Sequence, residues 1–361
     1  MNKKKICIVV TSLGNGGAER SSALLSQLLF NLGHDIHLAT TKNTIEYDYS
    51  GTLFNLELAL KGNKSSYNKF KVLKAYFSSH KFDYIIDNRI RNRFLKDFII
   101  YKYLFRGTKI ISVVRSFYLK YYMPKYKILG RLLYKDVYKI ITVSKSIKFK
   151  IENKYDLKNV ETIYNPVNSL LISNELNDKI DIQGSYILYF GRIEDNVKNL
   201  SLLINGYKTS NLLKNGIKLV LLGSGPDELL IKKKVESLNL EKYILFIPFT
   251  ANPFSYVKSA LFTVLTSHFE GFPRSILESL ACGTPVISVD CDSGPRELLI
   301  NGENGLLINN YDVEALANAM NLLIEDKELY LHCKRNVLKS VKHLEINEIS
   351  LQWKKIIEEE L

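Results

Sequence analysis

Residues 270–288 read Glu-Gly-Phe-Pro-Arg-Ser-Ile-Leu-Glu-Ser-Leu-Ala-Cys-Gly-Thr-Pro-Val-Ile-Ser, with Glu270 and Glu278 eight positions apart. An apolar segment of strand length, residues 261–266, precedes this run, and residues 285–289 form another. The predicted order is therefore strand, loop, helix and strand. The loop lies at the carboxyl end of the first strand, where open α/β sheets bind their ligands.

The helix between these strands has a predicted start and end. Pro273 suits its first position, and Gly283 suits the residue after its last turn. The N–H groups of residues 274–276 have no partner within the helix and carry positive partial charge, which suits a phosphate. Glu278 lies ~7 Å further along the axis and can accept hydrogen bonds from a ribose diol. Glu270 can accept them from a sugar beyond the phosphates, so one segment can hold sugar, diphosphate and ribose in line.

This pattern resembles the Glu-x7-Glu signature of the retaining, metal-independent glycosyltransferases of family 4, which have the GT-B fold. Three further motifs follow in the family's order: Gly-Thr-Pro-Val-Ile at 283–287, Ser-Gly-Pro-Arg-Glu at 293–297 and Asn-Gly-Glu-Asn-Gly at 301–305. Two solvated glutamates on an ordinary helix start would not explain this flanking pattern. The resemblance implies a donor site that includes Glu270, Gly271, Phe272, Pro273, Arg274, Ser275, Ile276 and Glu278.

Length and composition agree with a two-domain globular enzyme. The chain has 361 residues, of which 46% are hydrophobic and 24% charged. No apolar run approaches the ~18 residues that span a bilayer, and the apolar start reads as a strand rather than a signal peptide. The four cysteines have no metal-ligand spacing, which favours a reducing, bacterial-type cytosol.

Apolar runs alternate with amphipathic segments along the whole chain, which predicts parallel sheets covered by helices. Expected strands of the first half are 5–10, 37–40, 83–86, 109–114, 139–143 and 161–164. Those of the second half include 186–190, 218–222 and 243–247. We expect an acceptor-binding Rossmann-like domain at 1–166, a polar, irregular linker at 167–184 and a nucleotide-sugar-binding domain at 185–342. Residues 343–361 are expected to carry a helix that, by resemblance, crosses back to the first domain.

A second motif, Gly-Arg-Ile-Glu-Asp-Asn-Val-Lys-Asn, occupies residues 191–199 after an expected strand. Cleavage of a sugar–phosphate bond leaves extra negative charge on the diphosphate, which a fixed cation stabilises in the transition state. Arg192 and Lys198 match the family's diphosphate-binding Arg and Lys, although one extra residue separates them. With Glu270, they are the predicted catalytic residues; a surface loop with incidental charges is the alternative.

Glycine-rich loops follow a strand in each half. Gly14, Gly16 and Gly17 resemble the family's loop beside donor phosphates and acceptor, with a tight turn as the alternative. The loop lacks the third glycine and the later acid of a dinucleotide fingerprint, which argues against an NAD enzyme. Gly223 and Gly225 resemble the family's nucleotide loop or form a packing turn. Phe249 ends the stretch where the family holds the base.

Other polar residues leave alternatives open. Arg115 occupies the region where many family members place a histidine near the transferred sugar, so it either contacts donor or anionic acceptor or is structural. His268 is a possible neighbour of the donor sugar. Asp290 and Asp292 resemble a metal-binding Asp-x-Asp, but they follow a second-domain strand, so we expect no metal and no other cofactor.

Charge is unevenly distributed. Residues 1–165 hold 30 Lys and Arg against 12 Asp and Glu, whereas the remainder holds 20 against 25. Basic and aromatic residues alternate at 118–127, Tyr-Leu-Lys-Tyr-Tyr-Met-Pro-Lys-Tyr-Lys, which suits an anionic membrane surface. A solvated basic face is the alternative. No nucleic-acid-binding motif is present, so we expect no nucleic-acid partner.

The sequence therefore predicts a GT-B glycosyltransferase that moves a hexose or N-acetylhexosamine from a UDP-sugar, with retention of configuration. The expected acceptor is a lipid-linked glycan of cell-surface polysaccharide, lipopolysaccharide or capsule, contacted by Gly14 and Arg115. The expected location is cytoplasmic, peripheral on the inner face of the cell membrane. Alternatives are a nucleotide-sugar epimerase of the same fold and a non-enzymatic basic module that binds membrane or nucleic acid.

Overall fold

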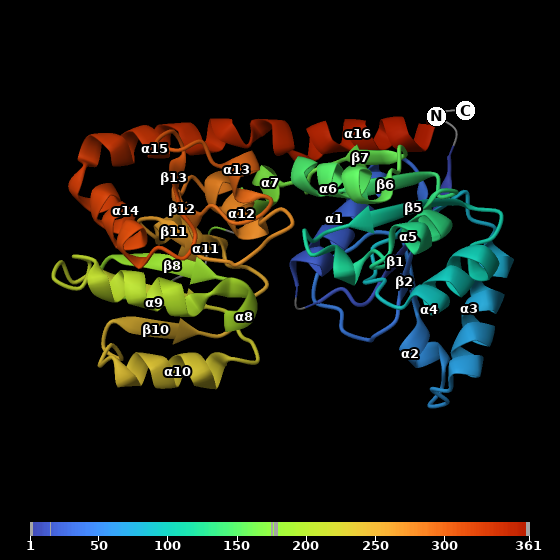
Figure 1. The fold of residues 1–361 in the computed structure, drawn as a ribbon, viewed down its shortest axis with the longest axis horizontal. Helices are drawn as coiled ribbons and strands as arrows, with labels where there is room; N and C mark the ends of the chain where they lie inside the picture. Colours follow the sequence, from blue (N-terminus) through green and yellow to red (C-terminus); the bar gives the residue numbers. More distant parts are fainter. Residues whose placement is uncertain (1–2, 15, 175, 177–179, 359–361) are drawn as a thin grey trace. The chain divides into compact units, whose positions relative to one another are not determined.

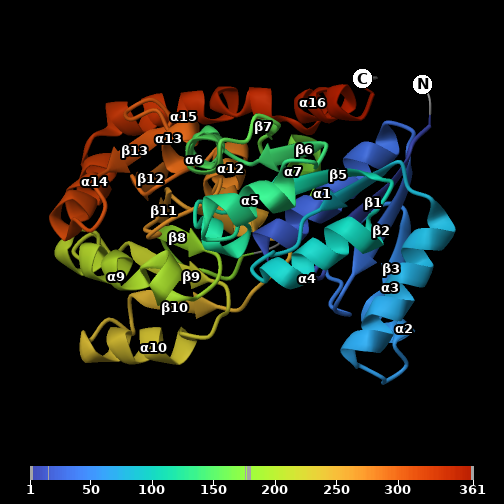
Figure 2. The same cartoon turned by 45° about the vertical axis from the view of Figure 1, so that its right-hand side comes forward.

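The computed structural model describes residues 3–14, 16–174, 176 and 180–358, and Figures 1 and 2 draw the chain in two orientations. The chain divides into two compact units. Unit 1 comprises Met1–Pro166 with Ile346–Leu361, and unit 2 comprises Val167–Glu345. Each unit is built around one parallel sheet.

The sheet of unit 1 has seven strands in the order β3-β2-β1-β4-β5-β6-β7, and all its pairings are parallel. Its strands are β1 (Lys5–Val10), β2 (Asp35–Thr40), β3 (Thr52–Asn55), β4 (Tyr84–Asp87), β5 (Lys109–Val114), β6 (Lys139–Thr142) and β7 (Val160–Thr162). The chain builds outward from β1 in one direction and then restarts at β4 on the other side. The crevice beyond β1 and β4 is therefore the switch point where such sheets accept ligands.

Unit 1 also contains α-helices. They are α1 (Gly17–Asn31), α2 (Leu56–Ala59), α3 (Ser66–His80), α4 (Phe94–Ile99), α5 (Lys127–Tyr134), α6 (Lys145–Tyr155) and α16 (Ile346–Glu358). The C-terminal helix α16 packs against α1, and Figure 1 draws it in red. Trp353 of α16 is buried, and Tyr84 donates a hydrogen bond to the Ile357 carbonyl at 2.9 Å. The last helix is thus an integral part of unit 1.

The sheet of unit 2 has six parallel strands in the order β10-β9-β8-β11-β12-β13. Its strands are β8 (Tyr186–Phe190), β9 (Lys218–Leu222), β10 (Ile244–Ile247), β11 (Thr263–Leu265), β12 (Val286–Val289) and β13 (Gly305–Ile308). Its helices are α7 (Ser169–Asn174), α8 (Asp195–Lys198), α9 (Leu200–Thr209), α10 (Glu228–Ser237), α11 (Phe254–Ser259), α12 (Arg274–Ala281), α13 (Pro295–Leu298), α14 (Val313–Glu325) and α15 (Lys327–Ser340). All five residues of β8 are buried, as expected for a central parallel strand covered on both faces.

The expected fold class, two Rossmann-like parallel-sheet domains, is confirmed. Two edge strands, β3 and β13, were not expected, because each has only four residues and a partly exposed pattern. Pro273 is the residue before α12 rather than its first residue, so that expectation was wrong by one position. The segment 167–184, expected to be irregular, contains the short helix α7.

Candidate functional site

The centre of the candidate site in unit 2 is an ion pair between Lys198 and Glu270. Lys198 ends α8 and Glu270 follows β11, yet Lys198 Nζ lies 2.7 Å from Glu270 Oε1. Ser267 Oγ donates to the same oxygen at 2.7 Å. The side chains are 22% and 12% exposed, so the pair is shielded but reachable. Two of the predicted catalytic residues, far apart in sequence, are therefore brought together.

The loop that carries Glu270 is fixed by three further hydrogen bonds. Thr266 Oγ1 donates to the Lys198 carbonyl at 3.0 Å, and the His268 N–H donates to the Val197 carbonyl at 2.9 Å. The Glu270 N–H donates to the Asp292 carbonyl at 3.3 Å. The carboxyl ends of β11 and β12 and the helix α8 are thus joined around the ion pair.

The second predicted carboxylate, Glu278, lies within the eight-residue helix α12 and is only 5% exposed. Arg274 donates to its Oε1 from Nε at 3.1 Å and from Nη2 at 2.7 Å. This pairing compensates the burial of the Glu278 charge. Before the helix, Ser293 Oγ donates to the Gly271 carbonyl at 2.9 Å and holds the turn. Glu270 and Glu278 therefore flank the start of α12, as the sequence predicted.

Arg192 is not brought to the Lys198–Glu270 pair. Its side chain is 57% exposed, and Nη1 lies 3.4 Å from Glu194 Oε2. The Tyr189 hydroxyl donates to the Arg192 carbonyl at 2.7 Å. Burial raises the pKa of Tyr189 well above its ordinary value, and the carboxylate of Glu270 adds to the effect. Tyr189 therefore stays neutral and serves as a donor that shapes the Arg192 loop.

The glycines of the second glycine-rich loop have a packing role. A Cβ on Gly223 would lie 1.9 Å from the Gly191 carbonyl oxygen, and a Cβ on Gly225 would lie 2.1 Å from the Ile193 carbonyl oxygen. Only glycine allows the two strand-end loops to approach so closely. Nearby, Phe249 is 40% exposed, and its N–H donates to Ser224 Oγ at 3.3 Å.

Asp290 and Asp292 have other roles in this structure. Asp290 forms an ion pair with Arg296, and the Asp292 carbonyl accepts the Glu270 N–H. Across the described ranges, with residues 15, 175 and 177–179 left out, no group of three His, Cys, Asp or Glu residues is arranged to hold a metal ion.

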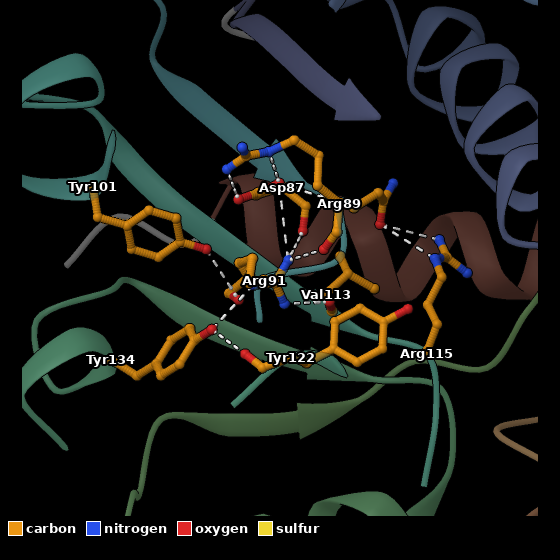
Figure 3. Close-up of polar contacts among 10 residues, drawn as sticks. Asp87, Arg89, Arg91, Tyr101, Val113, Arg115, Tyr122 and Tyr134 are labelled. Atoms are coloured by element: carbon orange, nitrogen blue, oxygen red, sulfur yellow. Dashed lines mark hydrogen bonds and ion pairs between the residues drawn. The ribbon is translucent and has the colours of Figure 1, made fainter. Parts of the chain in front are cut away.

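In unit 1, a buried ionic cluster that sequence reasoning missed lies beyond the ends of β4 and β5 (Figure 3). Arg89 donates to Asp87 from Nε at 2.9 Å and from Nη2 at 2.7 Å. Arg91 donates to the carbonyls of Asp87 and Arg89, both at 2.8 Å, and of Val113 at 2.6 Å. It also donates to the Tyr134 hydroxyl at 3.1 Å. Burial opposes ionisation of Asp87, but the guanidinium groups of Arg89 and Arg91 outweigh it and hold the pKa below its ordinary value.

Arg115 lies next to this cluster (Figure 3), and the side-chain amides of Asn88 and Asn165 hold it. Its Nη1 donates to Asn165 Oδ1 at 2.8 Å, and its Nε and Nη2 each lie 3.3 Å from Asn88 Oδ1. Asn88 directly follows β4, so the guanidinium connects the ends of β4 and β5 with the segment after β7. Arg115 thus has a structural function, and its half-buried side chain also lies at the sheet edge that accepts ligands.

The first glycine-rich loop is also closely packed. A Cβ on Gly14 would lie 2.9 Å from the Glu46 carboxyl carbon, and a Cβ on Gly16 would lie 2.3 Å from Glu19 Oε2. Gly17 begins α1. Asn15, between these glycines, lies outside the described residues. The loop follows β1, at the switch point of the sheet of unit 1.

Two family models match this chain. The model described as Glycosyltransferase Family 4 covers residues 15–169, and that described as Glycosyl transferases group 1 covers residues 174–340. One curated relative is the N-acetylgalactosamine-N,N'-diacetylbacillosaminyl-diphospho-undecaprenol 4-alpha-N-acetylgalactosaminyltransferase of Campylobacter jejuni. It is 31% identical over 344 residues, which are 90% of this chain and 92% of the relative. The chain belongs to the family 4 glycosyltransferases.

Other similarities agree with this assignment. The amylovoran biosynthesis glycosyltransferase AmsD of Erwinia amylovora is 23% identical to this chain. The match covers 90% of this chain and 91% of AmsD. A mutant TarM of S. aureus, solved with UDP, has a TM-score of 0.80 at 13% identity, over 99% of this chain and 100% of TarM. HepE of Anabaena, also solved with UDP, has a TM-score of 0.74 at 17% identity, over 97% and 98% of the chains. The fold of this glycosyltransferase is therefore GT-B, and neither the epimerase nor the non-enzymatic alternative is favoured.

In the part of the chain that the structure describes, no helix has the length and apolar character needed to cross a membrane.

Proposed function

We propose that this glycosyltransferase moves a hexose or N-acetylhexosamine from a UDP-sugar to a lipid-linked glycan in the synthesis of a cell-surface polysaccharide. The donor site is inferred from two cation-bound carboxylates, half-buried Glu270 and buried Glu278, on either side of the start of α12. The acceptor class follows from the lipid-linked acceptor in the name of the Campylobacter jejuni relative.

In this proposal the sugar, the diphosphate and the ribose lie along one segment. The first N–H groups of α12 bind the diphosphate, because a helix start favours negative charge. Glu278 accepts hydrogen bonds from the ribose hydroxyls, and its pairing with Arg274 reduces its repulsion of the phosphates. Glu270 accepts hydrogen bonds from the sugar hydroxyls. Phe249 and the Gly223–Gly225 loop lie on the side of the nucleotide base.

Lys198 and the exposed Arg192 provide positive charge for the leaving diphosphate. As the glycosidic bond breaks, charge accumulates on the UDP oxygens, and a cation positioned nearby stabilises this transition state more than the ground state. The Lys198 ammonium is already oriented by Glu270, so little reorganisation is needed. The exposed Arg192 side chain must turn from Glu194 to reach the diphosphate.

The family resemblance supports retention of configuration, with attack of the acceptor hydroxyl on the same face from which UDP departs. Gly14 and Arg115 at the sheet edge of unit 1 are proposed to contact the acceptor. A screen of UDP-, GDP- and ADP-sugars with lipid-linked acceptors, read by nucleoside diphosphate release, tests the donor class. We expect acceptor-dependent release from a UDP-sugar; turnover of GDP- or ADP-sugars alone would contradict the proposal.

Activity is expected to be independent of divalent metal. Lys198, Arg192 and the N–H groups of α12 supply the positive charge that a metal ion supplies in other transferases. Transfer rates should therefore be the same before and after dialysis against EDTA. Loss of activity with EDTA and its recovery with Mn²⁺ would instead assign a metal to Asp290 and Asp292.

We also propose that unit 1 binds an anionic membrane surface. Lys120, Lys125 and Lys127 are exposed, and Lys120 Nζ lies 4.8 Å from the ring centre of Tyr118. Tyr126 and Ile128 are 64% and 79% exposed. Aromatic and apolar side chains at headgroup depth, surrounded by lysines, suit the cytoplasmic leaflet.

Sedimentation with liposomes tests this surface. We expect binding to vesicles with anionic lipid but not to neutral vesicles, and release at high salt, because screening shortens the reach of the charges. Each lysine near the surface contributes about 1 kcal/mol, so replacing Lys120, Lys125 and Lys127 by Glu should abolish binding. The same change at Lys208, Lys214 and Lys242, exposed residues of unit 2, is the matched control. Equal sedimentation of both triple variants would contradict the proposal.

A further inference from the structure

A stacked aromatic pair, half-buried His268 and exposed Tyr311, begins two residues before Glu270. The rings of His268 and Tyr311 are stacked, with centres 5.4 Å apart and planes 29° apart. The Tyr311 hydroxyl lies 3.3 Å from His268 Nδ1, and Tyr311 is 65% exposed. His268 follows β11, and Tyr311 lies between β13 and α14. Both rings therefore belong to the carboxyl edge of the sheet of unit 2, the edge that carries Glu270.

The backbone of Tyr311 is strained. Its φ is 66°, in the left-handed region that glycine and asparagine occupy easily and that a tyrosine disfavours. A glycine at this position would adopt the same backbone conformation without strain, so the turn itself does not require a tyrosine. The Tyr311 ring is largely exposed to solvent, so its burial contributes little to offset the backbone strain. Strained residues that persist in this way concentrate at ligand sites.

Backbone contacts fix the position of His268 relative to Glu270. Phe269, between them, pairs with Asp292 as an isolated β-bridge, and His268 precedes Glu270 by two residues, a separation of at most ~7 Å along the chain. The hydrogen bond from the His268 N–H to the Val197 carbonyl fixes this position. A hydroxyl-binding carboxylate and an aromatic surface are therefore neighbours.

We propose that His268 and Tyr311 form a stacking surface for the pyranose ring of the donor sugar, whose hydroxyls bind Glu270. A pyranose presents an apolar C–H face and a rim of hydroxyls. The C–H face packs on aromatic rings, and the rim binds carboxylates. The pair thereby favours sugars whose apolar face is unobstructed and contributes to donor specificity. This inference rests on the proposed function and adds the residues that recognise the sugar.

The decisive variant is Tyr311→Gly, which removes the ring and relieves the strain. We expect its melting temperature to equal or exceed that of the wild type, and its affinity for UDP to be unchanged. Its affinity for the UDP-sugar should fall about 3- to 10-fold, the size expected for the loss of one stacking contact. Tyr311→Phe keeps the ring and should bind the UDP-sugar like the wild type. Asn239→Gly, at another left-handed residue of unit 2, is the matched control.

Calorimetric titration of UDP and UDP-sugars into the full chain separates this inference from the proposed function. Failure of the wild type to bind UDP would contradict the proposed donor. In that event, saturation-transfer NMR with free glucose and N-acetylglucosamine still tests the stacking surface, because the signals should weaken in Tyr311→Gly. Undiminished sugar binding by folded Tyr311→Gly, or a loss in Tyr311→Phe as large as in Tyr311→Gly, would overturn the inference.

Discussion

Glu270→Ala is expected to lower turnover by ~10²-fold or more while the protein stays folded. The variant loses the hydrogen bonds to the sugar that strengthen in the transition state, and it releases the Lys198 ammonium from its 2.7 Å contact. Both effects act on the chemical step, so kcat should fall more than KM rises. Initial rates of UDP release over a range of donor concentrations separate the two.

Two further variants make this test specific. Glu278→Ala should mainly raise KM for the donor, because its partner in the proposal is the ribose rather than the reacting sugar. Glu303→Ala, at an exposed glutamate of unit 2 that pairs with His332, should be kinetically silent. Wild-type kinetics in both Glu270→Ala and Glu278→Ala, with unchanged circular dichroism, would remove the donor site from this segment.

Asp87→Ala is expected to destabilise unit 1 by about 3–5 kcal/mol. The carboxylate is completely buried, and its removal leaves the Arg89 and Arg91 guanidinium groups without their counter-charge. Denaturant unfolding measures the loss. Asp136→Ala is the matched control, because Asp136 pairs with Lys102 at 2.8 Å on the surface and should contribute at most about 1 kcal/mol. Similar losses in the two variants would show that the cluster is not a major source of stability.

The same cluster predicts a pH dependence. Because the folded-state pKa of Asp87 is lower than its ordinary value, its contribution to stability is complete above the unfolded pKa. The contribution is lost as pH falls through the lower, folded value. The stability difference between wild type and Asp87→Ala should therefore be constant near neutral pH and diminish in acid.

Much of the fold could be read from apolar runs. Strands β1, β5, β8 and β9 have the predicted bounds, because buried parallel strands are almost continuously apolar. The edge strand β3, Thr52–Asn55, has one buried residue in four, so its sequence lacks that signal. The prediction was best for strands that are covered on both faces.

The site was predictable where one segment carries it and less so where distant segments meet. The Glu270 and Glu278 positions came from local spacing and helix signals. The contact between Lys198 and Glu270 depends on the order of β8 and β11 in the sheet, which the sequence only implied by resemblance. Asp87 and Arg91 were not singled out in the sequence, because only the fold buries them. The left-handed backbone of Tyr311 has no sequence signal, because tyrosine is a poor residue for it.

The most direct measurement is a crystal structure of the full chain with UDP bound. We expect diphosphate oxygens within hydrogen-bonding distance of the first N–H groups of α12 and of Lys198, with both ribose hydroxyls bound to Glu278. A nucleotide bound elsewhere, or a diphosphate held through a metal ion at Asp290 and Asp292, would contradict this expectation.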